Sequence, residues 1–558
     1  MSEKTGADVV VEGLVHAGVE VVFGIPSIHN LPIYDAIRRD GRIRAITVRH
    51  EQGASGAADG YARTTGRLGV CITSTGPGAA NAMGGQLEAY VSSTPILHLT
   101  GQIESRYVGK ARGYIHEVPD QFAMLASLSK GTYRASSVDD IADVLAGAVE
   151  EALSFPQGPV SLEIPIDFQY ATASAGRTSV SRQVTASVVP DDSEVAKAVE
   201  LIVKSRRPLV WAGGGVVAAN AGEEVVALVR RLGAGLLTSP NGRGVLPEDD
   251  PLCIGNLSWD ADVRTLCKEA DLLVAIGTRF QGPNTENWKM ELPQRLVHLD
   301  IDPSVPGRNY PAASAVVGDA KLSTAALLDG LDRAGKTEIL SEPGWLERVV
   351  AVTHSSKMRL RETLGTQVGL LDGLAACLPP TSVVVKDSTI SAYTWGNRLL
   401  PVHRPRTSIM PNSFAIGLGL PQAVGAAVGS GEPVVLLVGD GGILLAATEL
   451  ATVAVEHLAI VIIIFVDGGY GILRNMQDYQ FGFGEGRIGV DLGRPNFCEL
   501  ASAFGIEGVS VKTIEAYAAA VSRAIDSRQP CVIEVDLSAI GSMPVPFRGV
   551  SRPPVSIE

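Results

Sequence analysis

Short apolar runs recur along the chain, and most of them end in glycine or aspartate. In the first 175 residues the runs are VEVVFGIP, ITVRHE, LGVCITSTGPG and TPILHLTG, and stretches with helical spacing lie between them. A strand followed by glycine and then by a helix is typical of a parallel α/β sheet. Residues 1–175 are therefore predicted to form one such domain, and the Ser/Thr/Ala-rich residues 171–187 are predicted to form a linker.

Two further blocks repeat this alternation. Residues 190–335 contain the runs PLVWAGGG, DLLVAIGTRF and RLVHLDIDP, and residues 365–545 contain TSVVVKDST, EPVVLLVGDGG, AIVIIIFVDGGYG and PCVIEVDL. The chain is therefore predicted to be an α/β protein with three doubly wound parallel-sheet domains. Because ligands of open parallel sheets bind outside the carboxyl ends of the strands, we expect the third block to anchor the chemistry.

Composition and charge argue against several classes of function. The longest apolar runs, such as residues 459–466, are much shorter than the ~20 residues that span a bilayer, and the N-terminus lacks the pattern of a secretory signal. The net charge of −13 argues against a nucleic-acid partner. The six scattered cysteines show no metal-ligand spacing, and they fit a reducing cytoplasm. An anionic ligand must therefore be held locally, by a metal, by backbone N–H groups or by a helix end.

The second block contains one possible nucleotide site. Gly213–Gly215 follow an apolar strand-like run, and such a glycine turn can hold a phosphate. The same turn is common in any α/β sheet, and a full GxGxxG pattern is missing here. Both interpretations, a nucleotide site and a purely structural turn, stay open.

The strongest chemical pattern lies in the third block. Asp440 follows a buried strand-like run, and Gly441 and Gly442 begin a helical run whose N–H groups and dipole can face a phosphate. Asp467 ends the next strand-like run, at a separation of 467 − 440 = 27 residues. Strand, helix and neighbouring strand therefore bring the two aspartates to the same sheet edge. Two such oxygen ligands, together with diphosphate oxygens and a water, complete an octahedral Mg²⁺ site.

This GDG motif, with an oxygen ligand at that distance, resembles the cofactor motif of thiamine-diphosphate enzymes. Together with RHEQGASGAADGYAR, it makes nearly the whole chain resemble the superfamily of acetohydroxyacid synthase, pyruvate decarboxylase and benzaldehyde lyase. The resemblance implies pyrimidine-binding, central and diphosphate-binding domains in that order, and thiamine diphosphate and Mg²⁺ as cofactors. It also implies Asp440, Asp467 and the carbonyl of Gly469 as metal ligands. Asp467 departs from the family, which has Asn there, by an added charge.

Glu51 lies in the RHE motif, directly after a strand-like run. Out of context, such a glutamate is more often part of a surface salt bridge. The resemblance instead implies that Glu51 bonds N1′ of the aminopyrimidine, so that the cofactor's own imino group removes the C2 proton. It further implies that Ile416 supports the bend of the cofactor and that the carbonyl of Phe414 holds the 4′-amino group. The other residues expected at the cofactor are Gly76, Asp387, Ser388, Gly439, Gly441, Gly442, Tyr470, Gly471 and Ile472.

Two histidines are expected on the substrate side. His29 aligns with a loop in which benzaldehyde lyase also carries histidine, and His116 aligns where acetohydroxyacid synthases carry glutamine. A near-neutral pKa suits histidine for moving protons to and from a reaction intermediate, although a lone histidine is more often structural. Gln121, Leu473 and Met476 are expected to complete the substrate pocket. Met476 replaces a tryptophan of true acetohydroxyacid synthases, and RGYIHEVPDQ also resembles guanidino-2-oxoacid decarboxylases.

These features predict a 2-oxo-acid decarboxylase or carboligase that acts through a C2 ylide and an enamine. An aldehyde lyase or ligase without decarboxylation is the alternative within the class. A flavin-linked oxidase or a silent regulatory subunit are the alternatives outside it. Only IGNLSW resembles the family's flavin contact motif, so FAD stays open. The resemblance also implies a homodimer or homotetramer with active sites between chains, and 2-oxo acids or aldehydes as its small-molecule partners.

Overall fold

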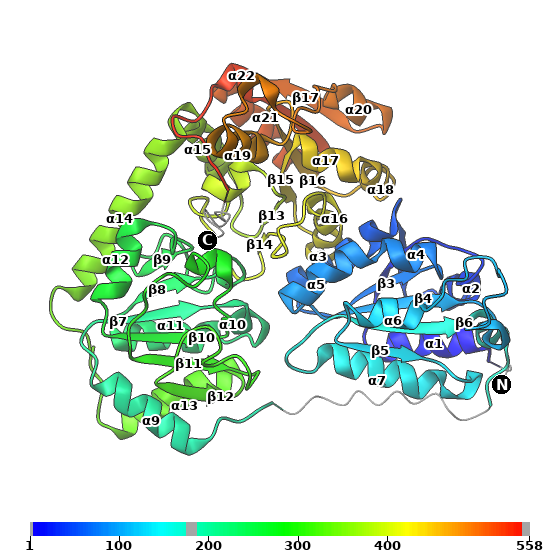
Figure 1. Cartoon of the computed structure of the whole chain (residues 1–558), viewed down its shortest axis with the longest axis horizontal. Coiled ribbons are helices and arrows are strands. Elements are labelled where there is room, and N and C mark those ends of the chain that lie inside the picture. The colour runs from blue at the N-terminus through cyan, green and yellow to red at the C-terminus, as the bar shows by residue number, and fades with distance from the viewer. Residues whose placement is uncertain (1–3, 175–186, 550–558) are drawn as a thin grey trace.

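The structure, a computed structural model, describes residues 4–174 and 187–549 (Figure 1). Its strands form three sheets of six parallel strands each, and helices cover the faces of the sheets. The predicted fold class is therefore confirmed. The predicted linker, residues 171–187, lies mostly outside the described residues.

The N-terminal sheet has the strand order β2-β1-β3-β4-β6-β5. Its strands are β1 (Val21–Gly24), β2 (Arg44–Thr47), β3 (Gly69–Thr73), β4 (Ile96–Gln102), β5 (Gly131–Arg134) and β6 (Val160–Pro165). The helices around it are α1 (Gly6–His16), α2 (Leu31–Asp40), α3 (Glu51–Thr65), α4 (Pro77–Asn81), α5 (Met83–Ser92), α6 (Gln121–Ala126), α7 (Ile141–Leu153) and α8 (Ile166–Tyr170).

The central sheet has the order β12-β11-β10-β7-β8-β9. Its strands are β7 (Pro208–Ala212), β8 (Gly235–Thr238), β9 (Cys253–Gly255), β10 (Leu272–Ile276), β11 (Leu296–Asp300) and β12 (Ser314–Val317). Its helices are α9 (Asp192–Val203), α10 (Gly214–Ala218), α11 (Gly222–Leu232), α12 (Ala261–Glu269), α13 (Ala320–Arg333) and α14 (Trp345–Leu364).

The C-terminal sheet has the order β14-β13-β15-β16-β18-β17, which repeats the topology of the N-terminal sheet strand for strand. Its strands are β13 (Val383–Lys386), β14 (Ser408–Ile409), β15 (Val434–Gly439), β16 (Ile460–Val466), β17 (Glu507–Val511) and β18 (Cys531–Asp536). Its helices are α15 (Val368–Cys377), α16 (Gly419–Ser430), α17 (Asp440–Ala446), α18 (Leu450–Val455), α19 (Gly471–Phe481), α20 (Phe497–Ala503), α21 (Ile514–Ser527) and α22 (Leu537–Ile540). Strands β15 and β16 are buried along their whole length, as expected for parallel strands between two layers of helices.

The N-terminal and C-terminal domains share one hydrophobic core, in which helix α3 packs against helix α16. Glycines permit this close contact. A Cβ on Gly60 would lie 2.1 Å from the carbonyl oxygen of Gln422, and a Cβ on Gly425 would lie 1.8 Å from that of Ala57. The Gly/Ala-rich stretches of the two blocks are therefore the surfaces that join these domains.

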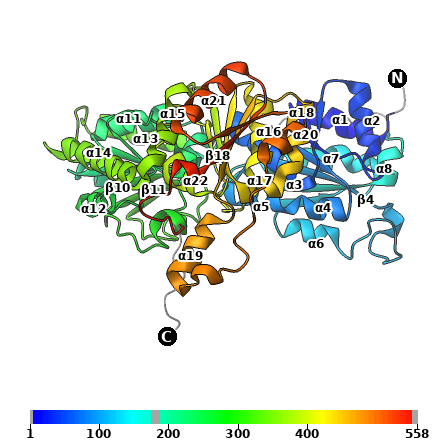
Figure 2. The same ribbon diagram turned by 90° about the horizontal axis from the view of Figure 1, so that it is seen from above.

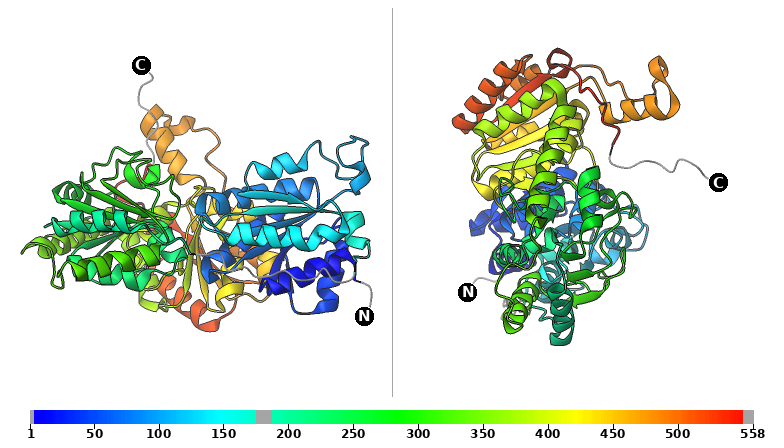
Figure 3. Two further views of the ribbon diagram at one scale, coloured as in Figure 1. Left: turned by 90° about the horizontal axis from the view of Figure 1, so that it is seen from below. Right: turned by 90° about the vertical axis from the view of Figure 1, so that its left-hand side faces the viewer.

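Helix α19 projects away from the body of the chain (Figures 2 and 3). None of its 11 residues is buried. Among the described residues, no helix combines the length and the apolar character that a membrane span requires. All six cysteines lie in the described part of the chain, and each of them is a free thiol.

Candidate functional site

The carboxyl ends of β15 and β16 bring Asp440 and Asp467 together. The backbone N–H groups of Asp467 and Gly468 donate to Oδ2 of Asp440, at 3.2 and 2.7 Å. The N–H of Gly441 donates to Oδ1 of Asp440 at 2.8 Å, and the N–H of Gly469 donates to Oδ1 of Asp467 at 3.2 Å. The two carboxylates therefore lie side by side at the sheet edge where the sequence places them.

Two neighbouring buried carboxylates repel each other, and a cation between them would remove this cost. Burial raises the pKa of Asp440. Burial and then the charge of Asp440 raise the pKa of Asp467 to about 6. Within the described residues no group of three or more His, Cys, Asp or Glu side chains could hold a metal ion. The expected Mg²⁺ site needs only two carboxylates, because the carbonyl of Gly469 and the diphosphate would supply other ligands. The donor set therefore fits Mg²⁺.

The start of helix α17 leaves space that only glycine permits. A Cβ on Gly441 would lie 2.6 Å from the ring of Tyr470, and a Cβ on Gly471 would lie 2.1 Å from Oδ2 of Asp467. Gly439 caps the helix in extended conformation directly after β15. These close approaches place the backbone at the start of α17 beside the two carboxylates, where the N–H of Gly441 now donates to Asp440. A glycine turn at a helix start is an arrangement that can hold a diphosphate.

The loop before α16 carries the residues expected at the pyrimidine. Asp387 is fully buried, and its carboxylate accepts hydrogen bonds from the N–H groups of Gly417 at 3.1 Å and Gly419 at 2.7 Å. These two bonds fix the conformation of the loop. The hydroxyl of Ser388 donates to the carbonyl of Phe414 at 3.1 Å. Phe414 has a positive φ of 60°, a conformation that costs energy for a residue with a Cβ and that is often found at functional sites. Ile416 is half-buried next to it.

A second group of predicted residues gathers in the N-terminal domain. Glu51 begins helix α3, and its Oε2 accepts a hydrogen bond from Nδ2 of Asn81 at 3.0 Å. Gly76 begins helix α4 with a φ of 59°, and a Cβ there would lie 2.2 Å from the carbonyl oxygen of His116. A Cβ on Gly78 would lie 3.2 Å from Oε1 of Glu51. The glycine turn after β3 therefore brings the glutamate and the histidine loop to one place.

His29 and His116 face each other, with their ring centroids 5.3 Å apart. His29 is buried, and its Nδ1 has no hydrogen-bond partner among the described residues. Burial, and then the nearby His116, lower the pKa of His29 to about 4, so its imidazole is neutral at pH 7. Nδ1 of His116 lies 3.3 Å from Oγ of Ser74. Like Phe414, His116 has a positive φ, here 64°.

Gln121 is buried, and its amide is used inside the N-terminal domain. Its Oε1 accepts from the N–H of Gly76 at 2.7 Å, and its Nε2 donates to Oε2 of Glu163 at 2.9 Å. Leu473 lies half-exposed on α19, and Met476 lies two residues beyond Arg474 on the same helix. The contacts of Gln121 suit a residue that holds the Gly76 turn. The expected roles of these residues in a substrate pocket stay predictions.

The two groups are separate within one chain. Among the hydrogen bonds and ion pairs of residues 4–174 and 187–549, none links the residues at Glu51 (Gly76, Gly78 and His116) to the pair Asp440 and Asp467. Two buried carboxylates that sequence reasoning missed hold backbone next to predicted site residues, across the boundary between the N-terminal and C-terminal domains. Glu449 accepts from the N–H groups of Arg49 and His50 at 3.0 and 3.1 Å. Glu88 accepts from the N–H of Ser413 at 2.9 Å. Their only signal in the sequence is a charged residue inside an otherwise apolar helical stretch.

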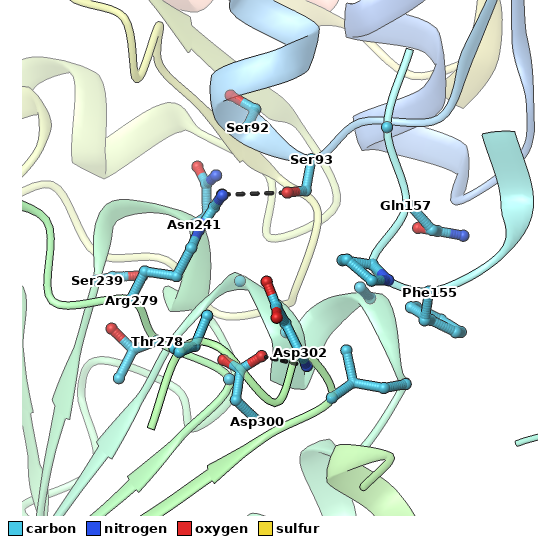
Figure 4. Close-up of a pocket in the computed structure, with 18 of the residues that line it drawn as sticks. Ser92, Ser93, Phe155, Gln157, Ser239, Asn241, Thr278, Arg279, Asp300 and Asp302 are labelled. Carbon is cyan, nitrogen blue, oxygen red and sulfur yellow. Dashed lines mark hydrogen bonds between the residues drawn. The ribbon is translucent and has the colours of Figure 1, made fainter. Parts of the chain in front are cut away.

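A cavity of about 520 Å³ lies between the N-terminal and central domains (Figure 4). Its wall includes the Gly214–Gly215 turn after β7, the side chain of Arg279, and Asp300 at the end of β11. Nη2 of Arg279 donates to Oγ of Ser93 at 3.1 Å, which joins the two domains across this cavity (Figure 4). The cavity is large enough for a small-molecule ligand. Whether Gly213–Gly215 bind a nucleotide such as FAD or form a purely structural turn stays open.

Comparison with known proteins agrees with this geometry. Three descriptions of one family match the chain: thiamine pyrophosphate enzyme, N-terminal TPP binding domain, at residues 4–124; central domain, at residues 195–327; and C-terminal TPP binding domain, at residues 390–535. The chain is 35% identical over 508 residues to a Pseudomonas aeruginosa protein named probable 2-ketoarginine decarboxylase, covering 90% of this chain and 88% of that protein.

Two further relatives are acetolactate synthase large subunits. The one from Methanocaldococcus jannaschii, named probable, is 30% identical over 97% of this chain and 93% of its own length. The one from Parasynechococcus marenigrum is 31% identical over 95% of this chain and 87% of its own length.

The three parallel sheets, with polar residues at their strand ends, define an α/β protein of the class whose members bind ligands at the carboxyl edges of their sheets. The chain belongs to the thiamine-pyrophosphate-dependent enzyme family. It is an enzyme that breaks or makes carbon–carbon bonds with thiamine diphosphate.

Proposed function

We propose that the protein is a thiamine-diphosphate- and Mg²⁺-dependent 2-oxo-acid decarboxylase or carboligase. The observation that carries this proposal is the neighbouring pair of buried Asp440 and half-buried Asp467 beside the glycine backbone of α17, which fits Mg²⁺ and a diphosphate together. The printed names of the relatives, a 2-ketoarginine decarboxylase and acetolactate synthases, support 2-oxo acids as the substrate class.

The residues of the chain divide the work between them. Asp440, Asp467 and the carbonyl of Gly469 would hold Mg²⁺, and the N–H groups of Gly441 and Gly442 would bind the diphosphate. Glu51 would hold a proton at N1′ of the aminopyrimidine. Thiamine diphosphate, when bound, supplies a nucleophilic carbon and an electron sink next to the 2-oxo carbonyl.

The histidine pair would move protons on the substrate side. His29 is neutral at pH 7 and has a free buried Nδ1, so it can take a proton from a hydroxyl group and return it. His116 lies next to His29, and its backbone carbonyl packs closely against Gly76. An aldehyde lyase or ligase needs the same proton transfers, and so this pair fits both reactions.

A panel of 2-oxo acids tests the function. We expect the protein with thiamine diphosphate and Mg²⁺ to release CO₂ from at least one acid and to form an aldehyde or a hydroxyketone. Removal of Mg²⁺ with a chelator should abolish this release. Aldehydes offered alone separate the alternative, because a lyase or ligase converts them without CO₂. A holoenzyme that binds the cofactor and releases no CO₂ from any acid would contradict the proposal.

We further propose that each active site forms between two chains. Helix α19 has no buried residue, and it exposes Tyr479 at 64% and Phe481 at 66%. Leu445 on α17 is 59% exposed close to the Asp440 group. Large exposed apolar side chains on these two helices support an interface here, and a second copy of this chain would also bring Glu51 to Asp440 and Asp467 of its partner. A homodimer or homotetramer follows.

Complementation between two inactive variants tests the shared site. Glu51→Gln and Asp440→Ala chains carry different tags and are expressed together. If each site takes Glu51 from one chain and Asp440 from the other, the mixed dimer has one site with both defects and one intact site. We therefore expect the mixed species to regain about half of the wild-type activity. Mixed dimers as inactive as their parents, or a fully active species that sediments at 58.4 kDa, would refute the arrangement. Co-expression of one variant under both tags is the control.

A further inference from the structure

A small cavity of about 30 Å³ lies where the central and C-terminal domains meet. Its wall includes Phe414 and Tyr393, so it is separated from the candidate pyrimidine site by one aromatic layer. The hydroxyl of Tyr393 is 2.9 Å from Oγ of Ser388, which in turn donates to the carbonyl of Phe414. Tyr393 and Phe414 therefore belong both to the wall of this cavity and to the hydrogen-bonded residues of the candidate pyrimidine site. Its volume admits a small polar group rather than a whole substrate.

Arg398 lines this cavity with an unpaired guanidinium. The guanidinium lies over the ring of Trp259 at 4.9 Å from its centroid, and 6.0 Å from that of Phe547. It donates no hydrogen bond to, and forms no ion pair with, any residue that the structure describes. Burial lowers the pKa of Arg398 to about 10, so the group is still a cation at neutral pH. Arg398 is partly buried. A partly buried cation without an anionic partner has a desolvation cost, and stacking on aromatic rings offsets only part of it.

Arg243, a buried arginine at the same domain boundary, is fully paired. Arg243 donates to both carboxylate oxygens of Glu248, at 2.7 and 2.6 Å, and to backbone carbonyls. Asp260 is the acid whose charge reaches Arg398. Its carboxylate, however, is bound by Arg359 and by the hydroxyl of Ser356. The contrast with Arg243 indicates that Arg398 lacks an anionic partner among residues 4–174 and 187–549.

Two buried amides make the same cavity polar. Asn256 is 5% exposed and Asn397 is 8% exposed, and both line the cavity. Nδ2 of Asn256 donates to the carbonyl of Asn397 at 3.1 Å, but the side-chain oxygens of both amides have no partner among the described residues. Buried polar atoms are normally hydrogen-bonded, so these oxygens await donors such as a ligand hydroxyl or a ligand-bound water. The cavity is thus suited to a polar group that brings a hydroxyl or a bound water to donate to these oxygens, and not to an alkyl chain.

We propose that Arg398 binds an anionic end group of the substrate, a carboxylate that lies away from the reacting 2-oxo carbonyl. The planar guanidinium matches a carboxylate with two parallel hydrogen bonds, and a carboxylate fits the small volume better than a phosphate does. This inference rests on the proposed function, and it narrows the substrate class to 2-oxo acids with a second anionic group. A cationic end group, such as the guanidinium of 2-ketoarginine, would be repelled by Arg398.

Kinetics with acids of similar length test the assignment. 2-Oxoadipate ends in a carboxylate, 2-oxohexanoate in a methyl group and 2-ketoarginine in a guanidinium. We expect wild-type kcat/KM to be highest for 2-oxoadipate. Arg398→Met should lower it ~10- to 100-fold for this acid, mainly by raising KM, and should change it less than about 3-fold for 2-oxohexanoate. Arg398→Lys should retain part of the kcat/KM that Arg398→Met loses, because lysine keeps the positive charge but lacks the two parallel N–H donors of the guanidinium.

Arg548→Met is the matched control. The Arg548 guanidinium also stacks on an aromatic ring, that of Tyr479 at 3.7 Å, but it is exposed and lines none of the cavity. We expect this variant to leave the preference among the three acids unchanged. An equal loss for all three acids in Arg398→Met would assign Arg398 a structural role and overturn the inference. A wild-type preference for the neutral or the cationic acid would overturn it as well, while the proposed function would stand.

Calorimetry with glutarate separates the inference from the proposed function. Glutarate has two carboxylates and no 2-oxo group, so its binding requires no turnover. We expect the wild-type holoenzyme to bind glutarate, and the Arg398→Met variant to bind it at least ~10-fold more weakly. If no 2-oxo acid releases CO₂, the proposed function fails, and this measurement still reports on Arg398. Equal glutarate affinity in the two proteins would leave water as the occupant of the cavity and refute the anion site.

Discussion

Replacing Glu51 with Gln is expected to slow proton exchange at C2 of bound thiamine diphosphate by about 10²- to 10⁴-fold. The amide can still accept the hydrogen bond that Asn81 donates to Oε2 at 3.0 Å, so the side chain should keep its position at the start of α3. The amide cannot, however, exchange a proton with N1′. The expected result is a holoenzyme that binds the cofactor with nearly wild-type affinity. Its turnover of 2-oxo acids should fall by the same factor as its C2 proton exchange.

Hydrogen–deuterium exchange at C2, followed by NMR after rapid acid quenching, measures this step directly. Cofactor binding is measured separately by calorimetry, because a loss of affinity alone would mimic the effect. Glu20→Gln is the matched control, since Glu20 is an exposed glutamate of the same domain that pairs with Arg67. A wild-type rate of C2 exchange in Glu51→Gln would remove Glu51 from the activation step.

The strands could be predicted from the sequence because parallel strands between two helical layers are buried on both faces. Such strands appear in the sequence as unbroken apolar runs, and the run from residue 459 to 466 corresponds to β16, Ile460–Val466. The glycine or aspartate that ends each run marks the carboxyl edge of a sheet. For this reason the pairing of Asp440 with Asp467 could also be inferred, since one βαβ unit brings the two residues together.

Contacts between distant segments left no periodic pattern in the sequence. Glu88 binds the backbone of Ser413 across more than 300 residues, and this contact exists only because α3 packs on α16. Arg398 is another case. Its environment combines Trp259 of the central domain with Phe547 near the C-terminus, and each of the three residues is unremarkable in its own segment. Side-chain partners of this kind depend on the packing of domains, which local sequence patterns do not encode.

Asp467→Asn is expected to preserve catalysis, whereas Asp467→Ala is expected to lose most of it. If Asp467 binds Mg²⁺, the amide oxygen of Asn still coordinates the ion. The Asn variant should therefore stay active and bind Mg²⁺ about 10-fold more weakly, while the loss of one negative charge should favour the diphosphate slightly. The Ala variant should lose cofactor affinity by ~100-fold or more, and it should recover part of its activity at high Mg²⁺ and thiamine diphosphate.

The surroundings of Asp467 also allow a purely structural role, because its Oδ1 accepts from the N–H of Gly469 at 3.2 Å as a turn residue would. Asp536 provides the comparison: it ends the neighbouring strand β18, and its Oδ1 accepts from the N–H of Ser538 at 3.0 Å. Asp536→Asn and Asp536→Ala should lower stability modestly and leave Mg²⁺ affinity unchanged. Titration of all four variants with Mg²⁺, with cofactor binding followed by fluorescence, distinguishes the two roles. A metal ligand separates Asn from Ala and is rescued by the ion, whereas an Asp467→Ala protein with wild-type cofactor affinity would exclude Asp467 from the metal site.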